Sequence, residues 1–342
     1  MEFLFWERIS LLKDLNNIVR VILIGAVNST LETLRKLVFH EFDIALVFGY
    51  RIRENEIISG YVDMSDYCNQ MGIPFKYFDS INSEDNIQFL EEVKPDLIFA
   101  VGLSQLVCPK ILEIPKLGCI GFHPTLLPRG RGRAPIAWLI LEEKFGAANF
   151  FLIGKGVDDG PIFVQQKFEI EDADDAEIIE QKILMSIGLA LDSWLPDLKK
   201  GLWNPIEQNG DLATYFEKRT ADDGWIDWHL DMYSVDRLIK ATSKPHPGAY
   251  TFLNHRRIVV LKSRIENTLK IKGVPGRVLR VNDKNEYLIQ CGMGLLWLSE
   301  IEDSDGKTFV AKVGQKFGYY VENEIFILKE QIKRLNKLID NQ

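Results

Sequence analysis

IVRVILIGAV (Ile18–Val27) is followed directly by the polar residues Asn28, Ser29 and Thr30. The apolar run is rich in β-branched residues and suits a strand that is buried on both faces. After the polar residues, leucine and valine recur at helical spacing through Val38, so we predict a strand, a turn and a helix that is capped by a small polar side chain. A β-α unit of this kind is the basic repeat of an α/β fold.

The same alternation continues along the next part of the chain. We predict further strands at 44–50, 73–78, 95–102, 118–122 and 149–153, and helices at 64–71 and 84–93. Alternating strands and helices are typical of a mostly parallel sheet with helices on both faces. Ligands bind such sheets beyond the carboxyl ends of the strands, so we expect function in the residues that follow each strand.

The pattern changes near residue 207. A helix is expected at 231–242, and five short strands with turn signals between 248 and 301 indicate a small antiparallel barrel. The tail has leucine and isoleucine at helical spacing from Leu328 to Ile339. We therefore predict an N-terminal extension (1–17), a Rossmann-like α/β domain (18–206), a linker (207–227), an OB-like β-barrel domain (228–327) and a C-terminal helix or tail (328–342).

Composition limits the classes of partner. The chain has 342 residues and a formal net charge of −8, which argues against nucleic acid as the main partner despite the local basic patch at Arg129, Arg131 and Arg133. Four widely spaced cysteines lack metal-ligand spacing, so we expect reduced thiols, with Cys119 in the core, and no metal. The N-terminus lacks a basic leader, and no apolar stretch reaches membrane-spanning length. These features favour a cytoplasmic protein with a small-molecule substrate and no membrane partner.

The segment GCIGFHPTLLPRGRGRAPIAW (Gly118–Trp138) carries the clearest chemical signal. His123 is expected at the mouth of a buried strand, followed by a rigid loop rich in Pro, Gly and Arg. An ionisable side chain in such a place is typical of general acid–base chemistry. The alternative is a histidine that caps the strand end through backbone hydrogen bonds.

A second signal is GKGVDDG (Gly154–Gly160), in which glycines flank two aspartates and expose the backbone of a tight turn. An aspartate beside His123 could orient the imidazole and favour its charged form. The alternative is an Asp-rich turn without catalytic function.

Taken together, these segments resemble the folate-dependent formyltransferases, which include methionyl-tRNA formyltransferase and the nucleotide-sugar N-formyltransferases. The family signature corresponds here to GFHPTLLP (121–128), RGRAPI (131–136) and DDGPI (158–162). Similar segments continue through YFEKRTADDGWIDW (215–228) and KATSKPHPGAYTF (240–252). The resemblance extends from Val19 to about residue 320.

The resemblance implies transfer of a formyl group from 10-formyltetrahydrofolate to a primary amine. His123 and Asp158 match the family's catalytic histidine and aspartate. The folate-contacting positions of the family correspond to Gln105, Leu106, Val107, Arg133, Gly154, Lys155, Gly156, Val157 and Asp158. Lys218 and Arg219 lie in a linker that is similar to one that contacts a nucleotide-sugar.

One position departs from the family. The catalytic asparagine, whose side chain helps to hold the developing oxyanion, falls on Gly121, and glycine cannot supply that donor. Three explanations stay open: His123 and backbone N–H groups suffice, another side chain such as Asn149 replaces the donor, or activity has been lost.

A nucleotide-linked amino sugar is the amine substrate that the sequence favours. With Arg133, the motif RGRAP (131–135) resembles that of the aminoarabinose-modifying enzyme more than the usual motif of the tRNA enzyme, and an acidic chain suits a small substrate better than tRNA. The alternatives are methionyl-tRNA formyltransferase, a catalytically impaired folate- or sugar-binding homologue, and a hydrolase that releases formate. The barrel-like second half argues against the hydrolase.

Overall fold

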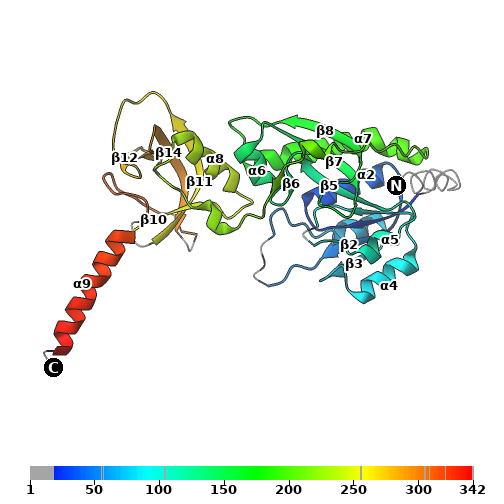
Figure 1. The fold of residues 1–342 in the computed structure, drawn as a ribbon, viewed down its shortest axis with the longest axis horizontal. Coiled ribbons are helices and arrows are strands. Elements are labelled where there is room, and N and C mark those ends of the chain that lie inside the picture. The colour runs from blue at the N-terminus through cyan, green and yellow to red at the C-terminus, as the bar shows by residue number, and fades with distance from the viewer. Residues whose placement is uncertain are drawn as a thin grey trace. The chain divides into compact units, whose positions relative to one another are not determined.

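The computed structural model describes residues 19–340, apart from residues 55, 57, 104, 255, 304, 305, 308 and 320. The predicted extension at 1–17 lies outside these residues. The chain divides into two compact units, one up to Arg219 and one from Thr220 onward, each described by itself (Figure 1). This division falls inside the segment expected to be a linker. The finer domain boundaries given above stay a prediction.

The first unit contains a seven-stranded sheet in the order β3-β2-β1-β4-β5-β7-β8. Five of these strands are parallel, whereas β5 pairs with β7, and β7 with β8, in antiparallel fashion. The mostly parallel α/β class is therefore confirmed. In chain order the strands are β1 (Arg20–Ile24), β2 (Asp43–Tyr50), β3 (Phe75–Phe78), β4 (Leu97–Ala100), β5 (Cys119–Thr125), β7 (Phe145–Leu152) and β8 (Ile162–Glu169).

Helices cover both faces of this sheet. Two neighbouring residues of β4 illustrate this. Ile98 packs in a cluster with α4 and α5, whereas the Phe99 ring lies 6.1 Å from that of Trp194 in α7. A strand buried on both sides must be apolar throughout. The helices are α2 (Asn28–Phe39), α3 (Ser65–Met71), α4 (Glu84–Val93), α5 (Pro109–Glu113), α6 (Pro135–Glu142) and α7 (Ala176–Lys199).

Two local predictions about this unit were wrong. The N-cap of α2 is Val27, not a small polar residue, because the Thr30 hydroxyl accepts a hydrogen bond from the Val27 N–H and donates to the Val101 carbonyl. The polar residues therefore form the first turn of the helix. In addition, β5 does not end before His123 but runs on to Thr125, since β7 continues to pair with it.

The second unit contains five antiparallel strands in the order β10-β11-β14-β13-β12, which confirms the predicted antiparallel fold. Its core is apolar and includes Trp228, Ile258, Leu298 and Phe317, all buried. The strands are β10 (Ala249–Leu253), β11 (Arg256–Glu266), β12 (Val278–Val281), β13 (Tyr287–Gln290) and β14 (Leu295–Asp303); the helices are α8 (Met232–Thr242) and α9 (Val321–Asp340). The terminal helix begins seven residues before the predicted tail.

Three cysteines lie in these cores. Cys119 is 1% exposed, as predicted. Burial raises the pKa of the Cys68 thiol to about 11 and that of Cys291 to about 12, so both stay protonated and unreactive near neutral pH. None of the described helices is long and apolar enough to cross a membrane.

Candidate active site

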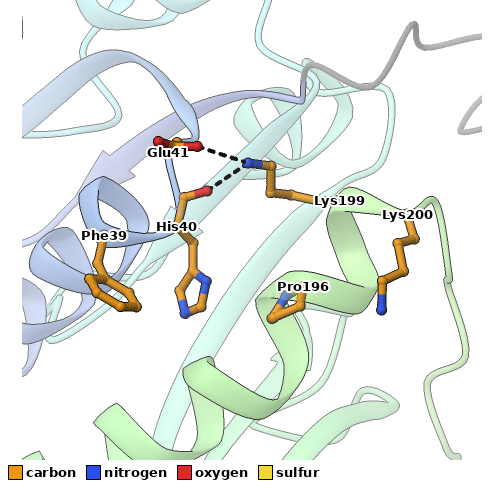
Figure 2. Close-up of a pocket in the computed structure, with 6 residues that line it drawn as sticks. All are labelled: Phe39, His40, Glu41, Pro196, Lys199 and Lys200. Carbon is orange, nitrogen blue, oxygen red and sulfur yellow. Dashed lines mark hydrogen bonds and ion pairs between the residues drawn. The ribbon is translucent and has the colours of Figure 1, made fainter.

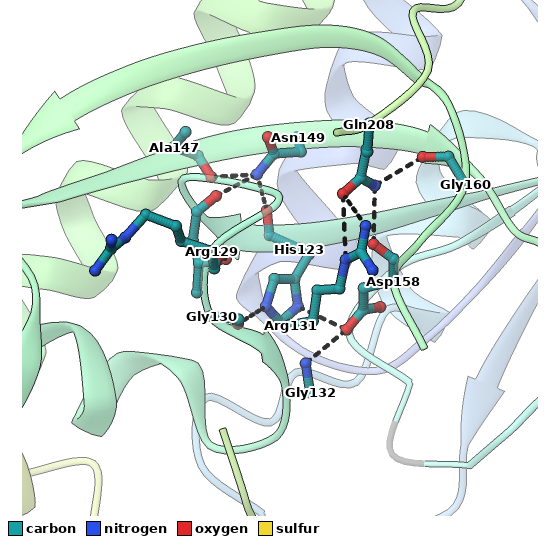
Figure 3. Close-up of polar contacts among 11 residues, drawn as sticks. His123, Arg129, Gly130, Arg131, Gly132, Ala147, Asn149, Asp158, Gly160 and Gln208 are labelled. Atoms are coloured by element: carbon teal, nitrogen blue, oxygen red, sulfur yellow. Dashed lines mark hydrogen bonds and ion pairs between the residues drawn. The ribbon is translucent and has the colours of Figure 1, made fainter. Parts of the chain in front are cut away.

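His123 is the centre of a buried polar cluster in the first unit (Figure 3). The residue is 5% exposed, and its Nε2 lies 2.8 Å from the Gly130 carbonyl oxygen. A carbonyl only accepts, so Nε2 carries a proton. The other ring nitrogen, Nδ1, lies 3.5 Å from the Asp158 carboxylate. Both ring nitrogens therefore lie beside acceptor oxygens, which hold the imidazole in one orientation.

The loop after β5 is held by the chain segment that precedes the second unit. Gly130 N–H donates to the Thr214 hydroxyl, and the short strand β6 (Arg131–Gly132) pairs in parallel with β9 (Tyr215–Phe216). The same Gly130 contacts His123 through its carbonyl. Residues near 215 are thus linked to the imidazole through a single residue.

Asp158 reaches this cluster by an unexpected route. Because β7 runs antiparallel to β5, its carboxyl end lies where β5 begins, with Leu152 opposite Ile120. The turn therefore leaves the sheet at the edge opposite to the one where His123 lies. The turn then folds back, and Asp158, at φ +48°, accepts a hydrogen bond from Gly132 N–H at 2.9 Å.

A buried clamp that the sequence did not reveal holds this turn. The Gln208 amide donates to the carbonyls of Asp158 and Gly160, at 2.8 and 2.7 Å. Its oxygen accepts from the guanidinium of Arg131, which is only 4% exposed and also donates to the Tyr215 hydroxyl. Gln208 lay in the expected linker, where no motif or periodicity marked it. The clamp fixes the backbone on both sides of Asp159.

Asn149 lies opposite His123 in the β5–β7 pair and is fully buried. Its amide nitrogen contacts three backbone carbonyls, those of His123, Thr125 and Ala147, and its oxygen accepts from Gln165 at 2.7 Å. An amide nitrogen has only two protons, so these carbonyls engage its full donor capacity. This arrangement suits a residue that holds the irregular end of β5 better than one that donates to a substrate oxygen.

Gly121 lies two residues before His123 on the same face of β5, opposite Phe151. A Cβ atom at this position would meet the Phe151 ring at 2.8 Å and the Ile153 side chain at 3.0 Å. Phe151 is 4% exposed. The space that an asparagine side chain would need next to His123 is therefore filled by apolar atoms, which supply no hydrogen-bond donor.

The other expected folate contacts lie in three places: the loop after β4, the turn after β7, and the residue that follows β6. Gln105 donates to the Asp79 carbonyl and accepts from Ile81 N–H, so its side chain holds the loop that follows β4. Leu106 is 86% exposed, and Val107 packs against the core. The turn residues Gly154, Lys155, Gly156 and Val157 are exposed, as is Arg133. Exposed apolar side chains on Leu106 and Val157 suit contact with an aromatic ligand.

An open hollow of about 460 Å³ lies beside the Arg129–Arg133 loop. It is lined by Arg129, Trp138, Glu142, Glu143, Thr214, Tyr215, Phe216 and Glu217. The Trp138 and Phe216 rings are stacked, with centroids 5.3 Å apart and planes 12° from parallel. The Arg219 guanidinium lies 5.0 Å from the centre of the Trp138 ring, whereas Lys218 is exposed. The structure thus brings Arg219, but not Lys218, to an aromatic surface near the site.

A second open hollow of about 630 Å³ lies at the ends of α2 and α7, far along the chain from the His123 loop (Figure 2). It is lined by Phe39, His40, Glu41, Pro196, Lys199 and Lys200. Lys199 is engaged there by the His40 carbonyl and the Glu41 carboxylate. None of the expected site residues lines this second hollow.

Comparisons with known proteins show the family to which the chain belongs. Residues 65–188 match the formyl transferase family, and residues 218–313 match the formyl transferase C-terminal domain. Methionyl-tRNA formyltransferase of Thermodesulfovibrio yellowstonii is 31% identical over 244 residues, covering 71% of this chain and 77% of that protein. The bifunctional polymyxin resistance protein ArnA of Wigglesworthia glossinidia brevipalpis is 34% identical over 211 residues, 61% of this chain and 32% of that protein.

Solved structures share the fold. WlaRD, a sugar 3N-formyl transferase crystallised with dTDP and 5-N-formyl-THF, has a TM-score of 0.61 at 16% identity over 82% of this chain and 97% of its own. HypX from Aquifex aeolicus, in complex with tetrahydrofolic acid, has a TM-score of 0.60 at 19% identity over 83% of this chain. This chain spans only 44% of the HypX chain.

The chain thus combines a mostly parallel α/β unit that carries the His123–Asp158 pair with an antiparallel unit. The chain belongs to the formyl transferase family and is a folate-dependent formyltransferase that uses 10-formyltetrahydrofolate.

Proposed function

We propose that this enzyme transfers the formyl group to the primary amine of a nucleotide-linked amino sugar. The observation that carries the proposal is the stacked Trp138–Phe216 surface with Arg219 beside it. Aromatic faces bind nucleobases by stacking, and a guanidinium pairs with phosphate. Thr214, which lines the hollow, accepts a hydrogen bond from Gly130, and the Gly130 carbonyl contacts His123. In this proposal the nucleotide occupies the hollow beside that loop.

In this proposal His123 and Asp158 carry the chemistry. The neutral amine attacks the formyl carbon, and the carbonyl electrons move to oxygen, where the positive charge of a doubly protonated His123 and nearby backbone N–H groups stabilise them. Asp158 keeps His123 charged and accepts the amine proton through water, since its side chain is 21% exposed. The bond from the formyl carbon to N10 of the folate then breaks, N10 takes up a proton, and the products are a formamide and tetrahydrofolate.

The folate donor would be held by two loops and one arginine. Leu106 and Val157 offer exposed apolar contacts, Gln105 and Val107 support the first loop, and Gly154, Lys155 and Gly156 expose the backbone of the second. Arg133, exposed on the loop after β6, offers a positive charge to the carboxylates of the folate tail. The apolar and basic character of these groups fits a flat heteroaromatic ligand with an anionic end.

Gly121 shapes the oxyanion site in this proposal. Since Phe151 and Ile153 fill the space of the missing asparagine, the positive charge of the imidazole and the backbone N–H groups are left to stabilise the developing oxyanion. Asn149 acts as a positioning residue that fixes the backbone of His123. Removal of one oxyanion donor often costs about 3–4 kcal/mol, so a slow enzyme is expected unless the imidazole makes up the loss.

The decisive experiment measures formyl transfer to a panel of nucleotide-linked amino sugars and to initiator methionyl-tRNA. We expect a formamide product with at least one sugar nucleotide and none with tRNA. The variant Trp138→Ala should raise the KM for the sugar nucleotide while the KM for the folate stays unchanged. Formylation of tRNA with comparable efficiency would exclude the proposal.

Methionyl-tRNA is the second candidate, and one feature of the chain favours it. The acidic excess lies entirely in residues 1–219, whereas Lys and Arg slightly outnumber Asp and Glu from residue 220 onward. A basic domain suits a phosphate backbone. For this candidate, transfer to tRNA should weaken steeply as the salt concentration rises.

A catalytically impaired binding protein is the remaining alternative, suggested by Gly121. It predicts thermal stabilisation by 5-formyltetrahydrofolate without turnover on any amine of the panel. Saturating a site at a hundred times its dissociation constant stabilises a protein by about 2.7 kcal/mol, which a melting experiment resolves.

A further inference from the structure

Figure 1 draws α9 (Val321–Asp340) as the last helix of the chain. Its sequence carries an apolar stripe with a regular repeat. Six of its residues follow one another at alternating intervals of four and three. Each is at least 46% exposed in the described structure. In chain order they are Val321, Ile325, Leu328, Ile332, Leu335 and Ile339. A seven-residue repeat of this kind is the seam of a left-handed coiled coil.

The side-chain types on this stripe are sorted by position. If Ile325 begins a heptad, isoleucine occupies each of the first positions (Ile325, Ile332, Ile339). Leucine occupies the fourth positions inside the helix (Leu328, Leu335). β-Branched residues at the first position with leucine at the fourth favour two parallel strands over higher assemblies. The pattern therefore specifies two parallel helices.

Charges that flank the stripe agree with a parallel pair of identical helices. Glu324 precedes the first heptad position and Lys329 follows the next leucine, at the two positions that meet across a parallel dimer. Gln331 and Asn336 occupy the same two positions one heptad later, and their amides can pair. In an antiparallel pair these residues would not meet, so the charge pattern selects orientation as well as partner.

Helices in proteins gain most of their stability from packing of an apolar face rather than from intrinsic propensity. The exposed stripe of α9 is such a face. We propose that α9 forms a parallel two-stranded coiled coil with α9 of a second copy of this chain, and that the enzyme is a homodimer joined through its C-terminal helices.

Sedimentation velocity of the full chain over a range of concentrations tests this. We expect a reversible dimer. Leu328→Asp should weaken it by about a hundredfold or more, equivalent to about 2.7 kcal/mol. Phe326→Asp is the matched control, because it removes a more exposed apolar residue from outside the stripe and should leave the dimer intact. A parent that is monomeric throughout, or equal effects of both variants, would overturn the proposal.

Orientation is tested by charge exchange and by cross-linking. Glu324→Lys should weaken the dimer severalfold, and adding Lys329→Glu should restore it. In a Cys108→Ser background, Leu335→Cys should form an intermolecular disulfide on oxidation, because equivalent positions face each other only in a parallel pair. A dimer that never forms this disulfide has another interface and contradicts the proposal.

Equal melting curves for Leu328→Asp and Phe326→Asp at low concentration would show that both variants fold.

Discussion

The region around His123 and the core of the second unit bury different kinds of side chain. Around His123 the buried residues are polar, and Arg131 and Asn149 are 4% and 0% exposed. In the second unit the buried cluster is almost wholly apolar, with Trp228 and Phe317 stacked at its centre. Apolar packing tolerates exchange at constant volume, whereas a buried polar network requires a particular partner for each donor and acceptor. Substitutions near His123 should therefore disturb specific hydrogen bonds, whereas substitutions in the core of the second unit should matter mainly when they change side-chain volume.

The largest effect that would sharpen this contrast is expected at His123. His123→Asn keeps a polar side chain but removes the charged ring, and turnover should fall by about a hundredfold or more, the usual scale for such groups. Folate binding, measured by thermal shift, should survive. Turnover within threefold of the parent would show that His123 only holds the loop through Gly130.

Asp158 should come next. Asp158→Asn keeps the shape of the side chain and suits the left-handed backbone at this residue, but it removes the charge beside the His123 ring. We expect a loss of about tenfold to a hundredfold in kcat, because the imidazole loses its counter-charge. A kcat within threefold of the parent would instead limit Asp158 to holding the loop through Gly132.

Sequence reasoning located the strands and helices of both units because apolar runs and helical spacing mark them directly. It also brought His123 and Asp158 together, but only through a family resemblance. The fold-back of the Asp158 turn and the Gln208 clamp could not be predicted, because they depend on the reversed direction of β7 and on a residue outside any motif. The commitment of Asn149 to backbone carbonyls likewise depends on the irregular register after His123.

Gly121 offers a test of the packing beside the site. Gly121→Asn forces a side chain against Phe151 and Ile153, so it should destabilise the first unit by about 1–3 kcal/mol as overpacking does. Adding Phe151→Leu should restore part of the lost stability, because it makes room for the new side chain. Turnover of the double variant should exceed that of Gly121→Asn alone. The measurements are thermal melting and kcat. A Gly121→Asn enzyme that melts like the parent would mean that Phe151 yields readily and does not block this space.

Asn149 separates positioning from direct catalysis. Asn149→Ala leaves the His123 and Ala147 carbonyls and the Gln165 amide without their partner, which should cost about 1–3 kcal/mol of unfolding free energy. Turnover of the folded enzyme should fall less than tenfold in this account, below the effect at His123. A hundredfold loss of turnover at unchanged stability would restore Asn149 as an oxyanion donor.

The smallest effect is expected in the second unit, at Glu266. Hydrogen bonds from the Thr268 hydroxyl and the Trp297 indole lower the pKa of this carboxyl to about 2. Since the folded pKa lies below the unfolded value of about 4.3, the ionised group adds stability above that pH and loses it as the pH falls toward 2.

Glu266→Gln should therefore show a slightly smaller loss of stability on acidification than the parent, measured as the denaturant midpoint of the second unit at each pH. Glu302→Gln on the same sheet controls for the removal of a carboxylate. Identical acid profiles for the parent and Glu266→Gln would mean that Thr268 and Trp297 bind the neutral side chain as well as the charged one. In that event the charge of Glu266 does not contribute to the stability of the second unit, and apolar packing accounts for that stability. This result would strengthen the contrast with the His123 region.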